Sequence, residues 1–195
     1  YTSVARNKRY NRKSEFLLEN LEWLGTLSKI TAGANYPQEQ INAMWETVLL
    51  NQFHDILPGS SIKEVYEDSR EQYEEILETG GALLENAASA VAKNIGLTGD
   101  SVVVFNPLSF TRSDLAVFAL PSGTGGAFLI SPDGQKLPLQ KTENGRAVFL
   151  AEKVPAKGYS VFNLEKAPAS APAAEKTDIA RALGNRFFDI CFDDI

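Results

Sequence analysis

The stretch that decides the fold is residues 62–96, IKEVYEDSREQYEEILETGGALLENAASAVAKNIG. Apolar residues recur in it every three or four positions, the spacing that places side chains on one face of an α-helix. The stripe comprises Ile62, Val65, Tyr66, Ser69, Tyr73, Ile76, Leu77, Leu83, Leu84, Ala87, Val91 and Ile95. We therefore expect a long helix over residues 62–95. A serine ahead of Glu64 suits a capping box at its start, and Gly80-Gly81 marks where it can bend.

The sequence before this helix predicts two more. Residues 4–32 carry an apolar stripe of the same period, which residues 33–36 break. Pro37 suits the first turn of a second helix, which runs through Phe53 and ends at residues 58–61, PGSS. Three amphipathic helices with short connections predict an antiparallel bundle that ends near Gly96.

After Gly96 the pattern changes to short β-rich runs. Strands fit residues 102–105, 115–118, 128–130, 147–150 and 159–163, with turn signals such as Asn-Pro and Pro-Asp-Gly between them. Residues 167–174 are rich in Pro, Ala and Ser, and residues 185–192 open another strand. We expect an α+β chain with four parts, the last of them truncated at the C-terminus. These are a three-helix bundle (1–96), an all-β, sandwich-like module (97–166), a linker or crossing loop (167–178) and the start of a large β domain (179–195).

The composition restricts the partners. A formal net charge of −6 argues against nucleic acid and against an anionic membrane surface, and we expect neither as a partner. No apolar run approaches the roughly 20 residues that span a bilayer. Cys191 is the single cysteine, which excludes an internal disulfide and a cysteine-based metal cluster and favours a reducing compartment. The sequence also lacks a glycine-rich phosphate loop and a Gly-x-Ser-x-Gly elbow.

The single histidine, His54, is followed by Asp55 at the point where the second helix opens into a Pro-Gly turn. Two interpretations stay open: a metal ligand facing a cleft, or a residue that satisfies the last carbonyls and the negative end of the helix dipole. Neighbours on a helix lie about 100° apart, so one of the pair could bind metal while the other contacts substrate. Because a metal site needs three or four ligands, the others must come from elsewhere.

Other patterns have a structural explanation beside the functional one. A run of acids on the third helix could supply the paired carboxylates of a glycosidase, but its helical spacing favours a solvated face. The run comprises Glu64, Glu67, Asp68, Glu71, Glu74, Glu75 and Glu78. Trp23 and Trp45 lie on apolar stripes, which favours core packing over sugar stacking.

Residues 49–62, LLNQFHDILPGSSI, closely resemble the middle-domain signature of glycoside hydrolase family 38 α-mannosidases, in which Gln-x-His-Asp precedes a Gly-Ser or Gly-Thr turn. Residues 1–12 look like the segment that enters that domain. Residues 105–109, FNPLS, resemble the opening of the β domain after it, and residues 185–188, NRFF, the strand that follows. The Phe before His54 and the Leu-Pro-Gly-Ser-Ser turn look like the cytosolic and bacterial branch, which implies a cytoplasmic location.

The resemblance implies a parent enzyme that hydrolyses terminal α-mannosides of oligosaccharides with retention, using zinc or another divalent cation. It makes His54 one zinc ligand and Asp55 a contact to a sugar hydroxyl, with Tyr1, Ser3 and Ser60 as further substrate-binding residues. The nucleophile, the general acid and the other ligands belong to an N-terminal catalytic domain of the same protein. Nothing in this sequence matches their motifs, so we assign no catalytic residue here and expect the chain alone to be inactive.

Two hypotheses of different classes remain. The first is a part of an enzyme: residues 1–3 fit neither an initiating methionine nor a signal peptide, and the chain stops just after a strand pattern, so we expect both ends to lie within a longer protein. The second is a non-catalytic carbohydrate-binding or interaction module. A His54 buried against apolar side chains of its own bundle would contradict the first. The sequence leaves open the linkage specificity, the identity of the metal and whether the parent is a homo-oligomer.

Overall fold

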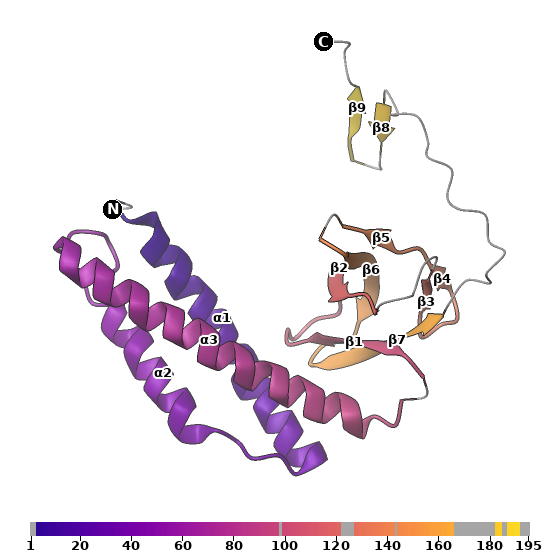
Figure 1. Ribbon diagram of the computed structural model, residues 1–195, viewed down its shortest axis with the longest axis horizontal. Helices are drawn as coiled ribbons and strands as arrows, with labels where there is room; N and C mark the ends of the chain where they lie inside the picture. The colour runs from indigo at the N-terminus through magenta and orange to yellow at the C-terminus, as the bar shows by residue number, and fades with distance from the viewer. Residues whose placement is uncertain are drawn as a thin grey trace.

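The computed structural model describes residues 3–97, 99–121, 127–142, 144–165, 182–184 and 187–191. Three long helices come first, and antiparallel strands follow them (Figure 1). This order confirms the predicted α+β class, with a helical bundle ahead of an all-β part. Within the described ranges, no helix combines the length and the apolar character that crossing a bilayer requires.

The helices are α1 (Ala5–Ala32), α2 (Gln38–Asn51) and α3 (Lys63–Asn94). α1 ends at Gly33, whose φ of 67° is the left-handed conformation that glycine adopts without a steric penalty. Successive helices reverse direction, so the start of α1, the end of α2 and the start of α3 lie at the same end of the bundle (Figure 1). Their apolar stripes meet in a core that contains Leu18, Leu21, Ile41, Met44, Val48, Tyr73 and Ile76.

The connection between α2 and α3 differs from the prediction. α2 ends at Asn51, before Phe53 and well short of residues 58–61, where the helix was expected to end. The capping box is also wrong, because Ile62 occupies the N-cap of α3 and no side chain bonds to the cap. The backbone N–H of Ser61 donates instead to the hydroxyl of Tyr66 at 3.0 Å. A contact from Tyr66 in the first turn of α3 has therefore replaced the cap that the sequence suggested.

The glycine pair inside α3 serves close packing, and the helix continues through it. A Cβ atom on Gly80 would lie 2.9 Å from Cδ2 of Leu17 and 3.5 Å from the sulfur of Met44, whereas one on Gly81 would have no atom within 4 Å. Gly80 thus faces α1 and α2, and Gly81 faces open space. The close approach of α1 to α3 depends on the missing side chain at Gly80.

Two antiparallel sheets form the β part. One has the order β1 (Ser101–Asn106), β7 (Gly158–Glu165), β3 (Phe128–Ile130), β4 (Lys136–Leu137); the other has the order β2 (Arg112–Ala119), β6 (Arg146–Val154), β5 (Gln140–Lys141). Leu129 and Phe162 of the first sheet share a buried core with Phe149 and Ala151 of the second. The rings of Phe149 and Phe162 meet edge to face, with centroids 4.9 Å apart. This packing confirms the predicted sandwich-like arrangement.

The bundle and the sheets join through the middle of α1 and the second half of α3. The ring of Trp23 meets that of Phe105 at 6.5 Å, and Phe105 also packs against the bundle cluster that contains Ala87. Trp45 packs against the bundle core and donates its indole N–H to Glu22 at 3.0 Å. Both tryptophans therefore have the packing role that their positions on the apolar stripes favoured.

The last described strands form a separate ladder. β8 (Ala182–Gly184) pairs antiparallel with β9 (Asp189–Cys191), so residues 189–191 of the strand expected over 185–192 are confirmed. The expected linker at 167–178 lies outside the described residues. The four domain limits stay predictions.

Candidate functional site

The turn after α2 exposes the histidine and the aspartate that the sequence singled out. Backbone hydrogen bonds tighten it: the N–H groups of Ile56 and Leu57 both donate to the carbonyl of Phe53, at 2.9 and 3.1 Å. The side chains of His54 and Asp55 are 76% and 58% exposed, and Nε2 of His54 lies 3.5 Å from Oδ2 of Asp55. The imidazole also packs against the ring of Phe53, with centroids 4.1 Å apart. His54 is therefore not buried against its own bundle.

The expectation that His54 and Asp55 lie on different faces of a helix is wrong. Both residues follow the end of α2 at Asn51, so the 100° rotation between helical neighbours does not apply to them. The turn brings the imidazole and the carboxylate to the same point on the surface. A nitrogen donor and an oxygen donor are thus presented together.

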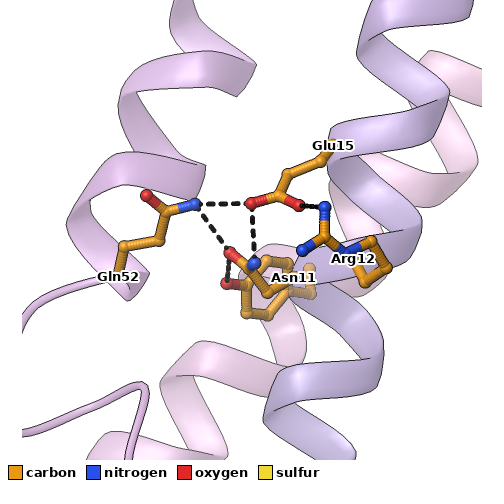
Figure 2. Close-up of polar contacts among 5 residues, drawn as sticks. Asn11, Arg12, Glu15 and Gln52 are labelled. Atoms are coloured by element: carbon orange, nitrogen blue, oxygen red, sulfur yellow. Dashed lines mark hydrogen bonds and ion pairs between the residues drawn. The ribbon is translucent and has the colours of Figure 1, made fainter.

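Amide side chains fasten the turn where it begins (Figure 2). Gln52, the C-cap of α2, donates from Nε2 to Oδ1 of Asn11 at 3.0 Å and to Oε1 of Glu15 at 2.9 Å. Asn11 donates in turn to the same Glu15 oxygen at 2.9 Å, and the other Glu15 oxygen lies 2.7 Å from Nη1 of Arg12. Asn51, which is buried, donates to Gln72 of α3 at 2.7 Å. The two residues before Phe53 are therefore tied to α1 and to α3.

Tyr73 adds a neutral donor to this network. Its buried hydroxyl donates to Oδ1 of Asn11 at 3.3 Å. Burial, followed by the negative charge of Glu15, raises the pKa of Tyr73 above its ordinary range. The phenol therefore keeps its proton and its donor role at neutral pH.

Hydroxyl groups fasten the turn where it ends. Tyr66 shares its hydroxyl hydrogen between the carbonyls of Asp55 and Ile56, at 3.3 and 3.2 Å, and accepts from the N–H of Ser61. Ser60 donates to the carbonyl of Asp55 at 3.4 Å. The backbone of Asp55 is thus held from two sides while its carboxylate stays exposed.

The start of the chain meets the same turn. Gly59 has a φ of 97°, and a Cβ atom on it would lie 3.0 Å from the backbone nitrogen of Val4 and 3.2 Å from Cβ of Ser3. Ser3 is therefore next to the turn that carries His54, Asp55 and Ser60. Tyr1, the remaining expected substrate-binding residue, lies outside the described residues.

The donor set fits part of a divalent-metal site. Imidazole nitrogen and carboxylate oxygen are both ligands that zinc accepts, and here they lie close together and open to solvent. In the described part of the chain, no group of three or more His, Cys, Asp or Glu residues is arranged to hold a metal ion. The long acid run of α3 is exposed along its length, in agreement with the solvated face that its spacing favoured. Any metal at His54 needs further ligands from outside these ranges.

The residues that hold the turn were not identified from the sequence, although the sequence contains a pattern that indicates them. Buried positions 7, 11, 14, 18 and 21 of α1 follow the helical period, and the first three of these are Asn7, Asn11 and Ser14. Polar residues on an otherwise apolar stripe indicate a polar contact between helices. The sequence does not say which partner each one has.

The fold and the turn define the class of protein to which the helical part belongs. Residues 1–91 match the model of the alpha mannosidase middle domain, and this part of the chain belongs to that family. The chain is homologous to α-mannosidases. It is 35% identical over 133 residues to Alpha-mannosidase 2C1 of Mus musculus, which covers 67% of this chain and 13% of that protein. It is 48% identical over 68 residues to Alpha-mannosidase of Saccharomyces cerevisiae, covering 34% of this chain and 6% of that protein.

Solved structures share the fold over almost the whole chain. An α-mannosidase from Enterococcus faecalis V583 matches with a TM-score of 0.67 at 17% identity, covering 97% of this chain and 27% of that one. A glycosyl hydrolase family 38 protein from Enterococcus faecalis matches with a TM-score of 0.66 at 16% identity, covering 97% and 28%. The bundle and the sheets are therefore arranged as in these proteins, and this chain spans less than a third of their length.

Proposed function

We propose that this chain is part of a retaining, divalent-metal-dependent α-mannosidase that hydrolyses terminal α-mannosides of oligosaccharides. The observation that carries the proposal is the exposed pair His54 and Asp55, held on a fastened turn with its nitrogen and oxygen donors 3.5 Å apart. Homology to α-mannosidases supports the substrate class. The proposal includes a cytoplasmic location for the enzyme.

In this proposal the turn forms one wall of the substrate site. His54 supplies one ligand to zinc or another divalent cation, and Asp55 accepts a hydrogen bond from a mannose hydroxyl. Ser3 and Ser60 contact the sugar beside them, with Tyr1 as a further contact. When bound, the cation supplies an attraction for sugar hydroxyl oxygens that favours a distorted ring. The residues of this chain hold and orient the sugar, and they do not attack it.

The bond-breaking groups belong to another part of the enzyme. A retaining glycosidase needs a nucleophilic carboxylate and an acid/base carboxyl group about 5 Å apart. The acids on α3 point to solvent along a helix, and we assign neither role to them. We propose that an N-terminal catalytic domain of the same protein supplies both, together with the other metal ligands. The chain alone is then inactive.

The test is hydrolysis of an aryl α-mannoside by this chain, by the longer protein that contains it, and by the longer protein with His54→Ala, each with and without added zinc. We expect activity in the longer protein only. We also expect His54→Ala to lower kcat/KM and bound metal by at least about 100-fold, since partners that only orient metal ligands already cost about 10- to 100-fold.

Matched controls separate a metal-ligand role from a general loss of structure. Asp55→Asn should raise KM or lower kcat with less loss of metal, because it removes a sugar contact. Glu78→Gln changes an exposed carboxylate on α3 and should leave both quantities unchanged. If His54→Ala retains full activity and metal, the metal-ligand role of His54 is wrong.

A further inference from the structure

We propose that Gln52 and Tyr66 are positioning residues, which fix the backbone on either side of Phe53-His54-Asp55 and so set the direction of the imidazole and the carboxylate. This inference rests on the proposed function of His54 and Asp55. Gln52 and Tyr66 then contribute to the geometry of the site as well as to the packing of the bundle. The side chains of Phe53, His54 and Asp55 are all exposed, so packing alone does not hold them.

The first step concerns Gln52, which immediately precedes the exposed residues. One amide nitrogen donates to both Asn11 and Glu15, at 3.0 and 2.9 Å, although these residues lie 41 and 37 positions away in the sequence. Glu15 is a carboxylate with a side chain only 23% exposed. A hydrogen bond to a half-buried carboxylate restricts the position of its donor more strictly than an apolar contact does. The end of α2 therefore has one preferred position against α1.

The second step concerns Tyr66, whose hydroxyl bonds to the exposed segment itself. Its contacts with the carbonyls of Asp55 and Ile56 fix the peptide plane that follows the Asp55 side chain. The N–H of Ser61 donates to the same hydroxyl at 3.0 Å. A single oxygen thus links both halves of the turn, and its removal leaves the ring packing of Tyr66 intact.

The third step is the distribution of buried polar residues. Five of them lie at this end of the bundle: Asn7, Asn11 and Ser14 near the start of α1, Asn51 at the end of α2, and Ser69 near the start of α3. Nδ2 of Asn7 and Oγ of Ser14 have no hydrogen-bond partner among the described residues. Apolar residues would stabilise a helix bundle more than such groups do. The apolar core already holds the helices together, so the polar end is better explained by the need for one defined turn geometry.

The experiment uses the fact that His54 is the single histidine of the chain, so one imidazole gives one set of NMR signals. In the native turn, the Phe53 ring lies 4.1 Å from the imidazole, so we expect it to displace those signals from the position of a free histidine. The variants are Gln52→Leu and Tyr66→Phe. The control is Tyr10→Phe, which removes a phenol bond of 3.0 Å to Glu74 between α1 and α3 without touching the turn. Far-UV circular dichroism verifies that each variant is folded.

We expect Tyr66→Phe to bring the imidazole signals at least halfway to the free position, while Tyr10→Phe leaves them unchanged. In the longer enzyme, Tyr66→Phe should weaken zinc binding and lower kcat by about 10-fold, the lower end of the effect of residues that orient metal ligands. Gln52→Leu should act in the same direction. Gln52→Asn keeps an amide donor at this position, so it should retain part of the signal displacement that Gln52→Leu loses. A purely structural loss does not predict this difference.

Two outcomes separate this inference from the function on which it rests. A folded Tyr66→Phe chain whose imidazole signals stay in the native position overturns the positioning role. Signals that move in the variants, together with unchanged zinc binding and kcat in the enzyme, support the positioning of the turn and contradict the proposed metal-ligand role of His54.

Discussion

The neighbouring glycines of α3 allow a paired test of the bundle packing. Gly80→Ala and Gly81→Ala both replace a helical glycine by alanine, which by itself should stabilise the helix by about 1 kcal/mol. Gly81 faces open space, so its variant should show that gain. At Gly80 the new methyl group would lie 2.9 Å from Cδ2 of Leu17, and overpacking of this kind costs about 1 to 3 kcal/mol. We therefore expect Gly80→Ala to be less stable than Gly81→Ala by about 1 to 3 kcal/mol.

Urea unfolding followed by circular dichroism measures this difference. With a slope of about 2 kcal/mol per M, a difference of 1 kcal/mol separates the two midpoints by about 0.5 M. Leu17→Ala combined with Gly80→Ala removes the clashing methyl groups and should reduce the penalty of the second substitution. Equal stabilisation by both alanines would refute the close contact between α1 and α3.

Two further predictions concern buried polar groups. Because burial and then Glu15 raise the pKa of Tyr73, the folded chain keeps a proton that the unfolded chain loses above about pH 10, so the free energy of unfolding should fall as the pH rises from there. Tyr73→Phe should make that fall shallower in urea unfolding at about pH 8 and about pH 11. Asn106→Ala should lower the free energy of unfolding by about 2 to 3 kcal/mol, because Nδ2 of Asn106 donates to the carbonyls of Phe110, Val154 and Pro155. The control Asn163→Ala changes an exposed residue and should cost under about 0.5 kcal/mol. Thermal unfolding of the two variants measures this difference.

Features carried by near neighbours in the sequence were predicted correctly. The three- and four-residue period of the helices, the Gly33 break and the strands after Gly96 depend on local chemistry, and the structure reproduces them. The motif at residues 49–62 likewise led to the middle-domain family, which the comparisons confirm. These features need no knowledge of which segments meet.

The details of the turn could not be predicted in the same way. Helical geometry suggested separate faces for His54 and Asp55, but α2 ends before them and their donor atoms meet. Ser61 suggested a capping box, but the hydroxyl of Tyr66 takes its N–H. In each case the geometry of the turn, which the helical period does not describe, replaced the expected arrangement.

The sequence by itself determined the class of fold, the order of its elements and the residues on which a function was to be sought. The tertiary structure alone decided that Gln52 reaches Asn11 across 41 positions and that Tyr66 holds the carbonyl of Asp55. The physical reason is that periodicity is a property of one helix, whereas a buried hydrogen bond needs two helices at a defined distance and rotation. The direction of the His54 side chain depends on hydrogen bonds between elements, and therefore on the tertiary structure.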